Sequence, residues 1–223
     1  MSGDGTRLPL VPLSDLVHFP RTELRLHVVD PSYLPLLQDL AETDEDSRWL
    51  GVVLLKPGWK HGRPEIFPGG TAARVMDLET LPDGRSDLLL YGEFRFELER
   101  ELGDAPYRQA LVRPVEEPWL DERDAGIVAV RQAILELLRS LCEELGDKLP
   151  LDVDALAAGD CAFEELINRI ATRMDVPPLR KLQLLSESLP ERGLSVLSIL
   201  RSRRQVMDML RRFRRLAAGS ERN

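Results

Sequence analysis

The hydrophobic period changes once along the chain, near Pro118, and this change constrains the fold more than any single motif. Between Arg7 and Glu117 apolar residues mostly alternate with polar ones, as in strands with one buried face. Beyond Pro118 they recur every three or four residues, as in amphipathic helices. We therefore predict an α+β protein with a strand-rich subdomain at residues 1–118, a helical subdomain at 119–217 and a disordered tail at 218–223.

The strand-rich half contains several strand and turn signals and one helix. The run LGVVLL from Leu50 suits a strand buried on both faces, whereas residues 94–99 alternate, so Arg95 is expected to face water. The turn at residues 82–84, Pro-Asp-Gly, joins two apolar-rich segments and predicts a long hairpin. Asp30 can cap an inserted helix. These elements favour a small, closed or nearly closed β-barrel.

The helical half carries four apolar stripes, which predict a bundle. Prolines and glycine supply the breaks between the stripes, and the last stripe extends from about residue 190 to 217, which predicts a long final helix. The stripes begin near Ile127, Phe163, Leu179 and Leu194.

Composition and charge narrow the function classes. Hydrophobic residues make up 43% and charged residues 30% of 223 residues, as in an ordinary soluble protein. No apolar run approaches the roughly 20 residues that a membrane helix needs, and the N-terminus lacks the apolar core of a signal peptide, so we expect a cytoplasmic protein. Residues 201–223 hold eight arginines and two acidic residues, a charge of +6; with −8 in total, the rest carries −14. Such an acidic body repels nucleic acid.

Motifs for catalysis, metals and nucleotides are absent from the sequence. The three histidines are isolated, and the two cysteines, Cys142 and Cys161, do not form CxxC pairs, so no metal site is expected. Neither a GxxxxGK[ST] loop nor a GxSxG motif occurs. We therefore predict no cofactor, no catalytic residue and no enzymatic activity, although a serine-lysine pair assembled only by the fold stays open.

Several motifs in order resemble the N-terminal domain of Lon protease. LPLVPLSDLVHFP is similar to the LPLxPL strand and following loop of that family, and GEFRF to its GxxRF motif. The helix DPSYLPLLQDL, the strand and hairpin GTAARVMDLETLPDGR, and the strand YRQALV also fit. The segment INRIATRMDVPPLRKLQLLSESLPERGLSVLSIL resembles the helical extension of the domain, so the resemblance covers about residues 7–202.

This resemblance implies a fold and a role. The fold is a pseudo-barrel of the kind shared with PUA domains, followed by helices. The role is contact with unfolded or tagged polypeptides, or with a partner protein, and self-association stays open. Full-length Lon also contains an ATPase module and a serine-lysine protease module, and neither occurs in this sequence. The resemblance thus implies a stand-alone, non-catalytic substrate-recognition or adaptor protein.

Four residues are candidate peptide contacts because their segments should be exposed. His18 and Phe19 follow the first strand, and Trp59 and Phe67 lie in the glycine-rich loop at 56–70. Exposed aromatic side chains commonly anchor peptides. The alternative is that these residues fold back over the ends of the barrel. A second binding mode is strand addition at an open sheet edge.

The basic tail is a candidate electrostatic contact. Its arginines lie on an amphipathic helix whose apolar side carries Val206, Leu210 and Phe213; the candidates are Arg204, Arg211, Arg212, Arg214 and Arg215. The alternative is that this apolar stripe docks on the bundle. An alternative function follows from the arginines, namely a PUA-like RNA-binding protein that uses this helix. RNA is the weaker reading because no RNP-like motif accompanies it.

Overall fold

The computed structural model describes residues 5–58, 63–81, 85–103, 105–145, 156 and 161–220, without the side chains of residues 144–145 and 214–220. The chain divides into two compact units. One comprises Met1–Pro118 together with Met174–Glu187, and the other Trp119–Arg173 together with Ser188–Asn223. The predicted α+β class is confirmed. The segment at 174–187, although helical, lies in the unit of the strands.

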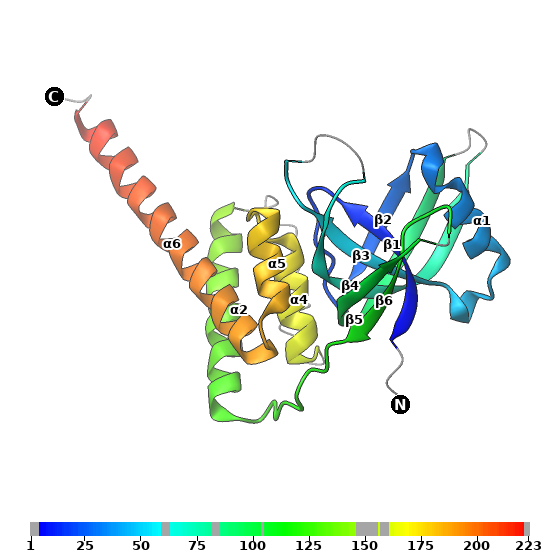
Figure 1. Cartoon of the computed structure of the whole chain (residues 1–223). Helices are drawn as coiled ribbons and strands as arrows, with labels where there is room; N and C mark the ends of the chain where they lie inside the picture. Colours follow the sequence, from blue (N-terminus) through cyan, green and yellow to red (C-terminus); the bar gives the residue numbers. More distant parts are fainter. Residues whose placement is uncertain are drawn as a thin grey trace. The chain divides into compact units, whose positions relative to one another are not determined.

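The first unit is built on a six-stranded sheet in the order β2-β5-β4-β3-β1-β6. Its strands are β1 (Thr6–Leu13), β2 (Glu23–Val28), β3 (Trp49–Leu55), β4 (Ile66–Thr80), β5 (Ser86–Leu102) and β6 (Gln109–Pro114) (Figure 1). The long strand β5 also pairs with β6, which closes the sheet into the predicted barrel. Of the strand pairs in the described residues, β1 with β3 is the parallel one, and the others are antiparallel. Among the described strands, β2 pairs with β5 alone, so the open sheet edge is at β2.

Tight strand packing explains the barrel core. All residues from Leu50 to Leu54 in β3 are buried, as their apolar run predicts. Phe96 of β5 is 1% exposed and fills the space beside the glycines of neighbouring strands. A Cβ atom on Gly70 would lie 2.5 Å from the carbonyl oxygen of Val52 and 2.8 Å from the Cζ of Phe96. Glycine is therefore needed there to let β3, β4 and the phenyl ring approach each other.

The inserted helix covers one side of the barrel. The chain enters it through a 3₁₀ turn, η1 (Pro31–Tyr33), and Asp30 caps this turn by accepting a hydrogen bond from the backbone N–H of Ser32 at 2.9 Å. Helix α1 (Leu34–Glu42) follows, and its buried residues are Leu36, Leu37 and Leu40. They pack into the apolar cluster around Leu50 and Leu90, as Figure 1 shows from the position of α1 beside the strands. A second 3₁₀ turn, η2 (Glu45–Ser47), leads into β3.

Helix α5 (Pro178–Ser186) completes the first unit, and its position shows that one expectation from the sequence is wrong. It contacts β4. Arg95 was expected to face water but is 6% exposed, because its guanidinium donates hydrogen bonds to the backbone carbonyls of Leu185 and Glu187 at the end of this helix. A cation at the negative end of a helix is stabilising, and the helix excludes water from the arginine.

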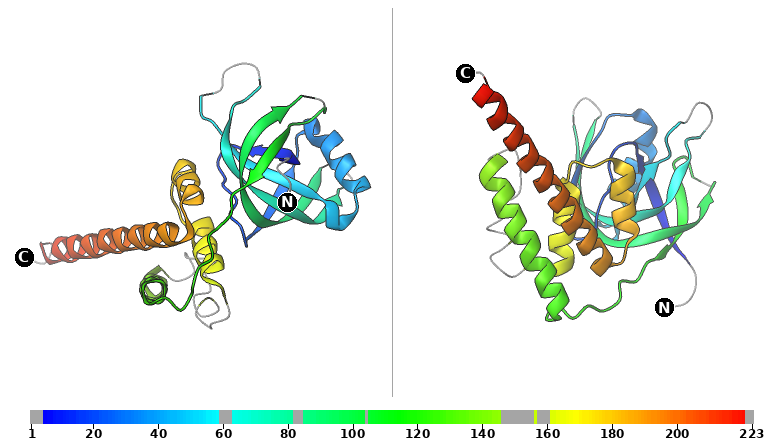
Figure 2. Two further views of the ribbon diagram at one scale, coloured as in Figure 1. Left: turned by 60° about the horizontal axis from the view of Figure 1, so that its bottom comes forward. Right: turned by 90° about the vertical axis from the view of Figure 1, so that its left-hand side faces the viewer.

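The second unit is a helical assembly. It contains α2 (Ala125–Leu145), α4 (Phe163–Arg173) and α6 (Leu189–Ser220), with α2 and α4 both packed on α6 (Figures 1 and 2). The fully buried Arg192 donates a 2.8 Å hydrogen bond to the side-chain oxygen of Asn168, which is also fully buried. The predicted long final helix is confirmed, and it continues to Ser220, so residues 218–220 of the expected tail are helical. Residues 221–223 of that tail, and Gly146, lie outside the described residues.

Candidate functional site

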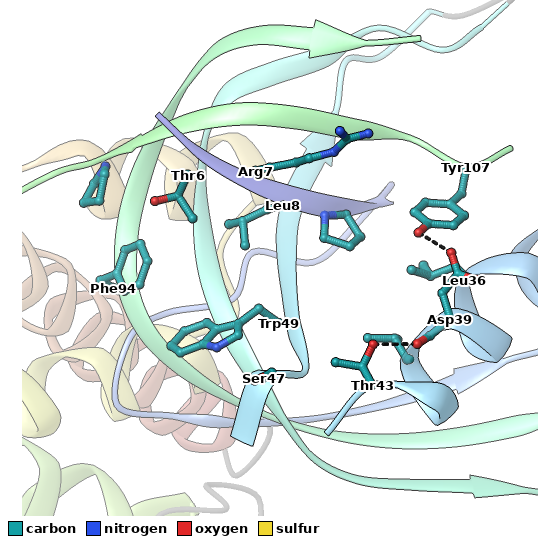
Figure 3. A pocket seen from close by; sticks show the side chains of 13 residues that line it. Thr6, Arg7, Leu8, Leu36, Asp39, Thr43, Ser47, Trp49, Phe94 and Tyr107 are labelled. Atoms are coloured by element: carbon teal, nitrogen blue, oxygen red, sulfur yellow. Dashed lines mark hydrogen bonds between the residues drawn. The ribbon is translucent and has the colours of Figure 1, made fainter. Parts of the chain in front are cut away.

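A cavity of about 540 Å³ lies in the first unit, between α1 and the strands of the barrel. One wall comes from β1, including Arg7 and Leu8, and the opposite wall from α1 and η2 (Figure 3). Its volume is within the usual range of ligand pockets, about 300 to 1,000 Å³. We call this cavity the α1 pocket.

One end of the α1 pocket is aromatic. Trp49 begins β3 and Phe94 lies in β5; both are half-buried, and both line the cavity (Figure 3). Their ring centroids are 5.8 Å apart and the ring planes are tilted by 42°. This tilted arrangement is a favourable one for aromatic pairs, and the rings offer an apolar surface to a ligand. Leu8 and Pro114 extend that surface.

The other end of the pocket is polar and held by hydrogen bonds. The hydroxyl of Tyr107 donates to the Oδ2 atom of Asp39 at 2.6 Å, and Thr43 donates from Oγ1 to the backbone carbonyl of Asp39 at 2.7 Å (Figure 3). Burial, and then the hydrogen bond to Asp39, raise the pKa of Tyr107 above its ordinary value. The tyrosine therefore stays neutral and remains a donor to this carboxylate. Across the cavity, Arg7 donates from Nε to Gln109 at 2.7 Å.

The chemistry available in the pocket is that of recognition. Two aromatic rings can cover an apolar side chain, and the polar end can accept or donate hydrogen bonds to a main chain. Among the described residues, no group of three or more His, Cys, Asp or Glu side chains is arranged to hold a metal ion. In the same part of the chain, no helix combines the length and apolar character that crossing a bilayer demands.

The expected exposure of His18 and Phe19 is wrong. Phe19 is fully buried and His18 is 2% exposed. The hydroxyl of Thr71 in β4 donates to the carbonyl of His18 at 2.6 Å, while the imidazole Nε2 bonds to the carbonyl of Thr22 at 3.0 Å. Burial lowers the pKa of His18 to about 4. The segment therefore folds back on the barrel, which is the alternative that the sequence left open.

The second pair of predicted contacts is only partly described. Trp59 lies outside the described residues. Phe67 is half-buried and belongs to β4, which begins at Ile66, so the expected loop at 56–70 ends earlier than predicted. The structure does not bring Phe67 into the α1 pocket.

The arginines of α6 have different surroundings. Arg204 donates to the side chain of Ser140 in α2 and pairs with Asp208 at 3.3 Å, so it has a structural role. Arg211 and Arg212 are exposed. The side chains of Arg214 and Arg215 lie outside the described residues.

The apolar stripe of α6 does not dock on the other helices that the structure describes in its unit. Val206 is 50%, Leu210 51% and Phe213 66% exposed, and Met209 beside them is 54% exposed. The alternative that the sequence left open, docking of this stripe on the bundle, is therefore wrong for these residues. The reason is length, because α6 runs on beyond the end of α2, and none of the described helices of its unit lies beside it there (Figures 1 and 2).

Sequence reasoning missed the α1 pocket. Its walls come from residues 6–9, 36–49, 94, 107 and 114, which are distant in the sequence. The aromatic side chains have no shared motif, and each alone reads as an ordinary core residue. The one usable signal is that Trp49 directly precedes the buried run of β3 and thus stands at a strand end.

Comparison with known protein families assigns the chain to one of them. The family model of the ATP-dependent protease La (LON) substrate-binding domain matches residues 7–202. The chain belongs to this family. The resemblance predicted from the motifs is thereby confirmed, and the α1 pocket is a feature of a Lon substrate-binding domain.

Relatives of this Lon domain are full-length proteases. It is 25% identical over 205 residues to the Lon protease of Flavobacterium johnsoniae, an alignment that covers 91% of this chain and 25% of that protein. It is 27% identical over 205 residues to the Lon protease of Anaeromyxobacter dehalogenans, with 91% and 24% covered. The chain thus spans about a quarter of the length of these relatives.

Solved structures show the same fold. The N-terminal domain of a Mycobacterium avium complex Lon protease matches with a TM-score of 0.67 at 14% identity, over 87% of this chain and 98% of that one. A Lon N-terminal domain protein from Xanthomonas campestris matches with a TM-score of 0.61 at 24% identity, over the same shares. The barrel followed by helices is therefore the fold of Lon N-terminal domains.

Proposed function

We propose that the chain binds segments of unfolded or tagged polypeptides and that the α1 pocket receives a client side chain. One observation carries this proposal: the cavity opens between the half-buried rings of Trp49 and Phe94 and the hydrogen-bonded pair of Asp39 and Tyr107. A partner side chain would bury the rings, and main-chain groups would meet the polar end.

Family membership supports a binding role, since the family is defined as a substrate-binding domain. We assign recognition, and no bond cleavage, to the residues of this chain, as a substrate-recognition or adaptor protein. The protease activity named for the relatives belongs to proteins of which this chain matches about a quarter.

Fluorescence anisotropy with a labelled unfolded client of the casein type tests the proposal. We expect a dissociation constant on the order of micromolar, which Trp49→Ala and Phe94→Ala each raise about tenfold or more. Trp119→Ala is the matched control, because Trp119 is 86% exposed and does not line the pocket. Absence of binding to every unfolded client, or an equal loss in the control, would contradict the proposal.

The fluorescence of Trp49 can also show directly whether a client occupies the pocket. The chain has three tryptophans, so the double variant Trp59→Phe/Trp119→Phe leaves Trp49 as the single fluorophore. Its emission should move to shorter wavelength when a client covers the ring. Trp59 and Phe67 remain proposed contacts, and their alanine variants belong in the same titration.

RNA binding through α6 is a second candidate, favoured by the exposure of Arg211 and Arg212. Filter binding at low salt would detect it, and the affinity should fall steeply with salt. The double variant Arg211→Ala/Arg212→Ala should weaken it uniformly across RNA sequences. If wild-type protein retains no RNA at low salt, this candidate fails.

A further inference from the structure

The wall of the α1 pocket formed by α1 and η2 is strongly acidic. The same segment that supplies Asp39, Thr43 and Ser47 to the lining also carries four further exposed carboxylates, at Glu42, Asp44, Glu45 and Asp46. Five carboxylates within eight consecutive residues, 39–46, thus stand at one side of an aromatic cavity.

The nearby arginines offset this charge only in part. Arg48 is turned toward the end of α1, where it donates from Nε to the carbonyl of Thr43 at 2.9 Å and lies 3.9 Å from Glu45. Arg7, on the opposite wall, is bonded to Gln109. Counted over the wall segment 39–48 and the facing Arg7, five carboxylates against two arginines leave a net charge of −3.

We propose that the α1 pocket selects polypeptide segments in which an apolar or aromatic residue is flanked by lysine or arginine. This inference rests on the proposed function and specifies its client. The rings of Trp49 and Phe94 would cover the apolar side chain, and the acidic wall would attract the neighbouring cations. An acidic segment of equal hydrophobicity would meet the same rings and be repelled by the wall.

Charge complementarity of this kind mainly determines which clients are preferred and contributes less to the affinity itself. The carboxylates are exposed, so each pair contributes little, and salt screens it. Several such pairs around one apolar anchor nevertheless separate clients of opposite charge. The apolar anchor supplies the affinity and the wall supplies the preference.

The test uses three short labelled peptides that share one Phe-Leu core and differ only in flanking residues, which are arginine, serine or glutamate. Anisotropy titrations at low salt should rank them in that order, with the arginine peptide about tenfold tighter than the glutamate peptide. Raising the salt to about 0.5 M should bring the three together, since the screening length shortens to a few ångström.

A charge-neutralising variant locates the effect. Glu42→Gln/Asp44→Asn/Asp46→Asn should remove most of the preference for the arginine peptide and leave the serine peptide unchanged. The matched control is Glu23→Gln/Asp77→Asn/Glu79→Gln, which removes three exposed carboxylates of β2 and β4, outside the segment 39–47 that supplies the pocket wall. An equal effect of both variants would mean that net charge, and not the pocket wall, sets the preference, which overturns the inference.

The outcomes separate the two proposals. If no peptide binds, or if Trp49→Ala leaves all three affinities unchanged, the proposed function fails. If the peptides bind through Trp49 but show no order by charge, the pocket function stands and the inference about its clients is wrong. Preference for the glutamate peptide would also overturn it.

Discussion

Arg95 and Glu117 form an ion pair of 2.7 Å inside the first unit, with only 7% of the arginine side chain exposed. The same guanidinium donates to the carbonyls of Leu185, at 2.6 Å, and Glu187, at 3.1 Å. One side chain of β5 thus holds both the segment after β6 and the end of α5. Because α5 follows β5 by some eighty residues, this contact fastens a distant part of the chain to the barrel.

Replacing this arginine should loosen α5. Arg95→Met keeps the apolar stem but leaves the two carbonyls and Glu117 without their cation, and we expect a loss of about 3 kcal/mol in the free energy of unfolding. Arg95→Lys should recover only part of this, since one ammonium cannot reproduce the planar fork. Denaturant unfolding measures both, and a loss below about 0.5 kcal/mol for Arg95→Met would contradict the structural role. Hydrogen exchange in α5 should rise in the same variant.

Arg21 has a strained backbone that glycine would relieve. Its φ is 58°. Arg21 and Thr22 lie together opposite the single residue Gly92, as in a β-bulge. The Arg21 N–H donates to the Gly92 carbonyl at 2.8 Å, and the Gly92 N–H donates to the Thr22 carbonyl at 3.0 Å. Left-handed backbone costs other residues about 1 kcal/mol more than glycine. Arg21→Gly should therefore be about 1 kcal/mol more stable than Arg21→Ala, since both variants lose the exposed pair with Glu93. Thermal unfolding of the two variants decides it.

Gly193 in α6 should resist substitution despite its helical position. A Cβ atom there would lie 2.7 Å from the Cζ of Phe163, whose side chain is fully buried. Alanine gains up to about 1 kcal/mol in helix propensity, but overpacking costs about 1 to 3 kcal/mol, so Gly193→Ala should be destabilising overall. Adding Phe163→Leu should make the glycine substitution less costly. Ser198→Ala, at an exposed position of the same helix, is the control and should be neutral or stabilising.

The stability of the first unit should fall in mild acid because of His18. Its pKa is lowered from 6.5 to about 4 by burial, so the unfolded chain binds a proton more readily than the folded one between these values. The contribution of neutral His18 is fully present above pH 6.5 and is lost as the pH falls toward 4, by about 3 kcal/mol. His18→Gln should keep a donor for the Thr22 carbonyl and remove this slope. The free energies of unfolding of the wild-type protein and of His18→Gln, plotted against pH between 4 and 6.5, should therefore converge at low pH. Parallel plots would refute the assignment.

Local sequence patterns predicted the secondary structure where the conformation of a residue depends on residues close to it in the chain. The apolar run at Leu50 became a strand buried from Leu50 to Leu54, and Asp30 caps the 3₁₀ turn that leads into the inserted helix. Arg95 shows the limit of such patterns. Alternation places it on the outer face of β5, but α5 covers that face, and no property of the strand itself could indicate a cover formed by residues 178–187.

The candidate site was less accessible to prediction than the fold. The sequence pointed to His18 and Phe19 because they follow the first strand in a segment that should be exposed, yet Thr71 and the barrel enclose them. Conversely, Trp49 lies in β3, Phe94 in β5 and Tyr107 in the connection before β6, and they meet only through the closure of the sheet.

The sequence by itself determined the order of strands and helices, the family and the uneven distribution of charge. Each of these depends on residues close together in the chain or on motifs of fixed spacing. Only the tertiary structure decided which aromatic side chains line a cavity and which arginines are buried. Burial depends on contacts between segments far apart in the chain, and the closure of β5 against both β4 and β6 sets those contacts here.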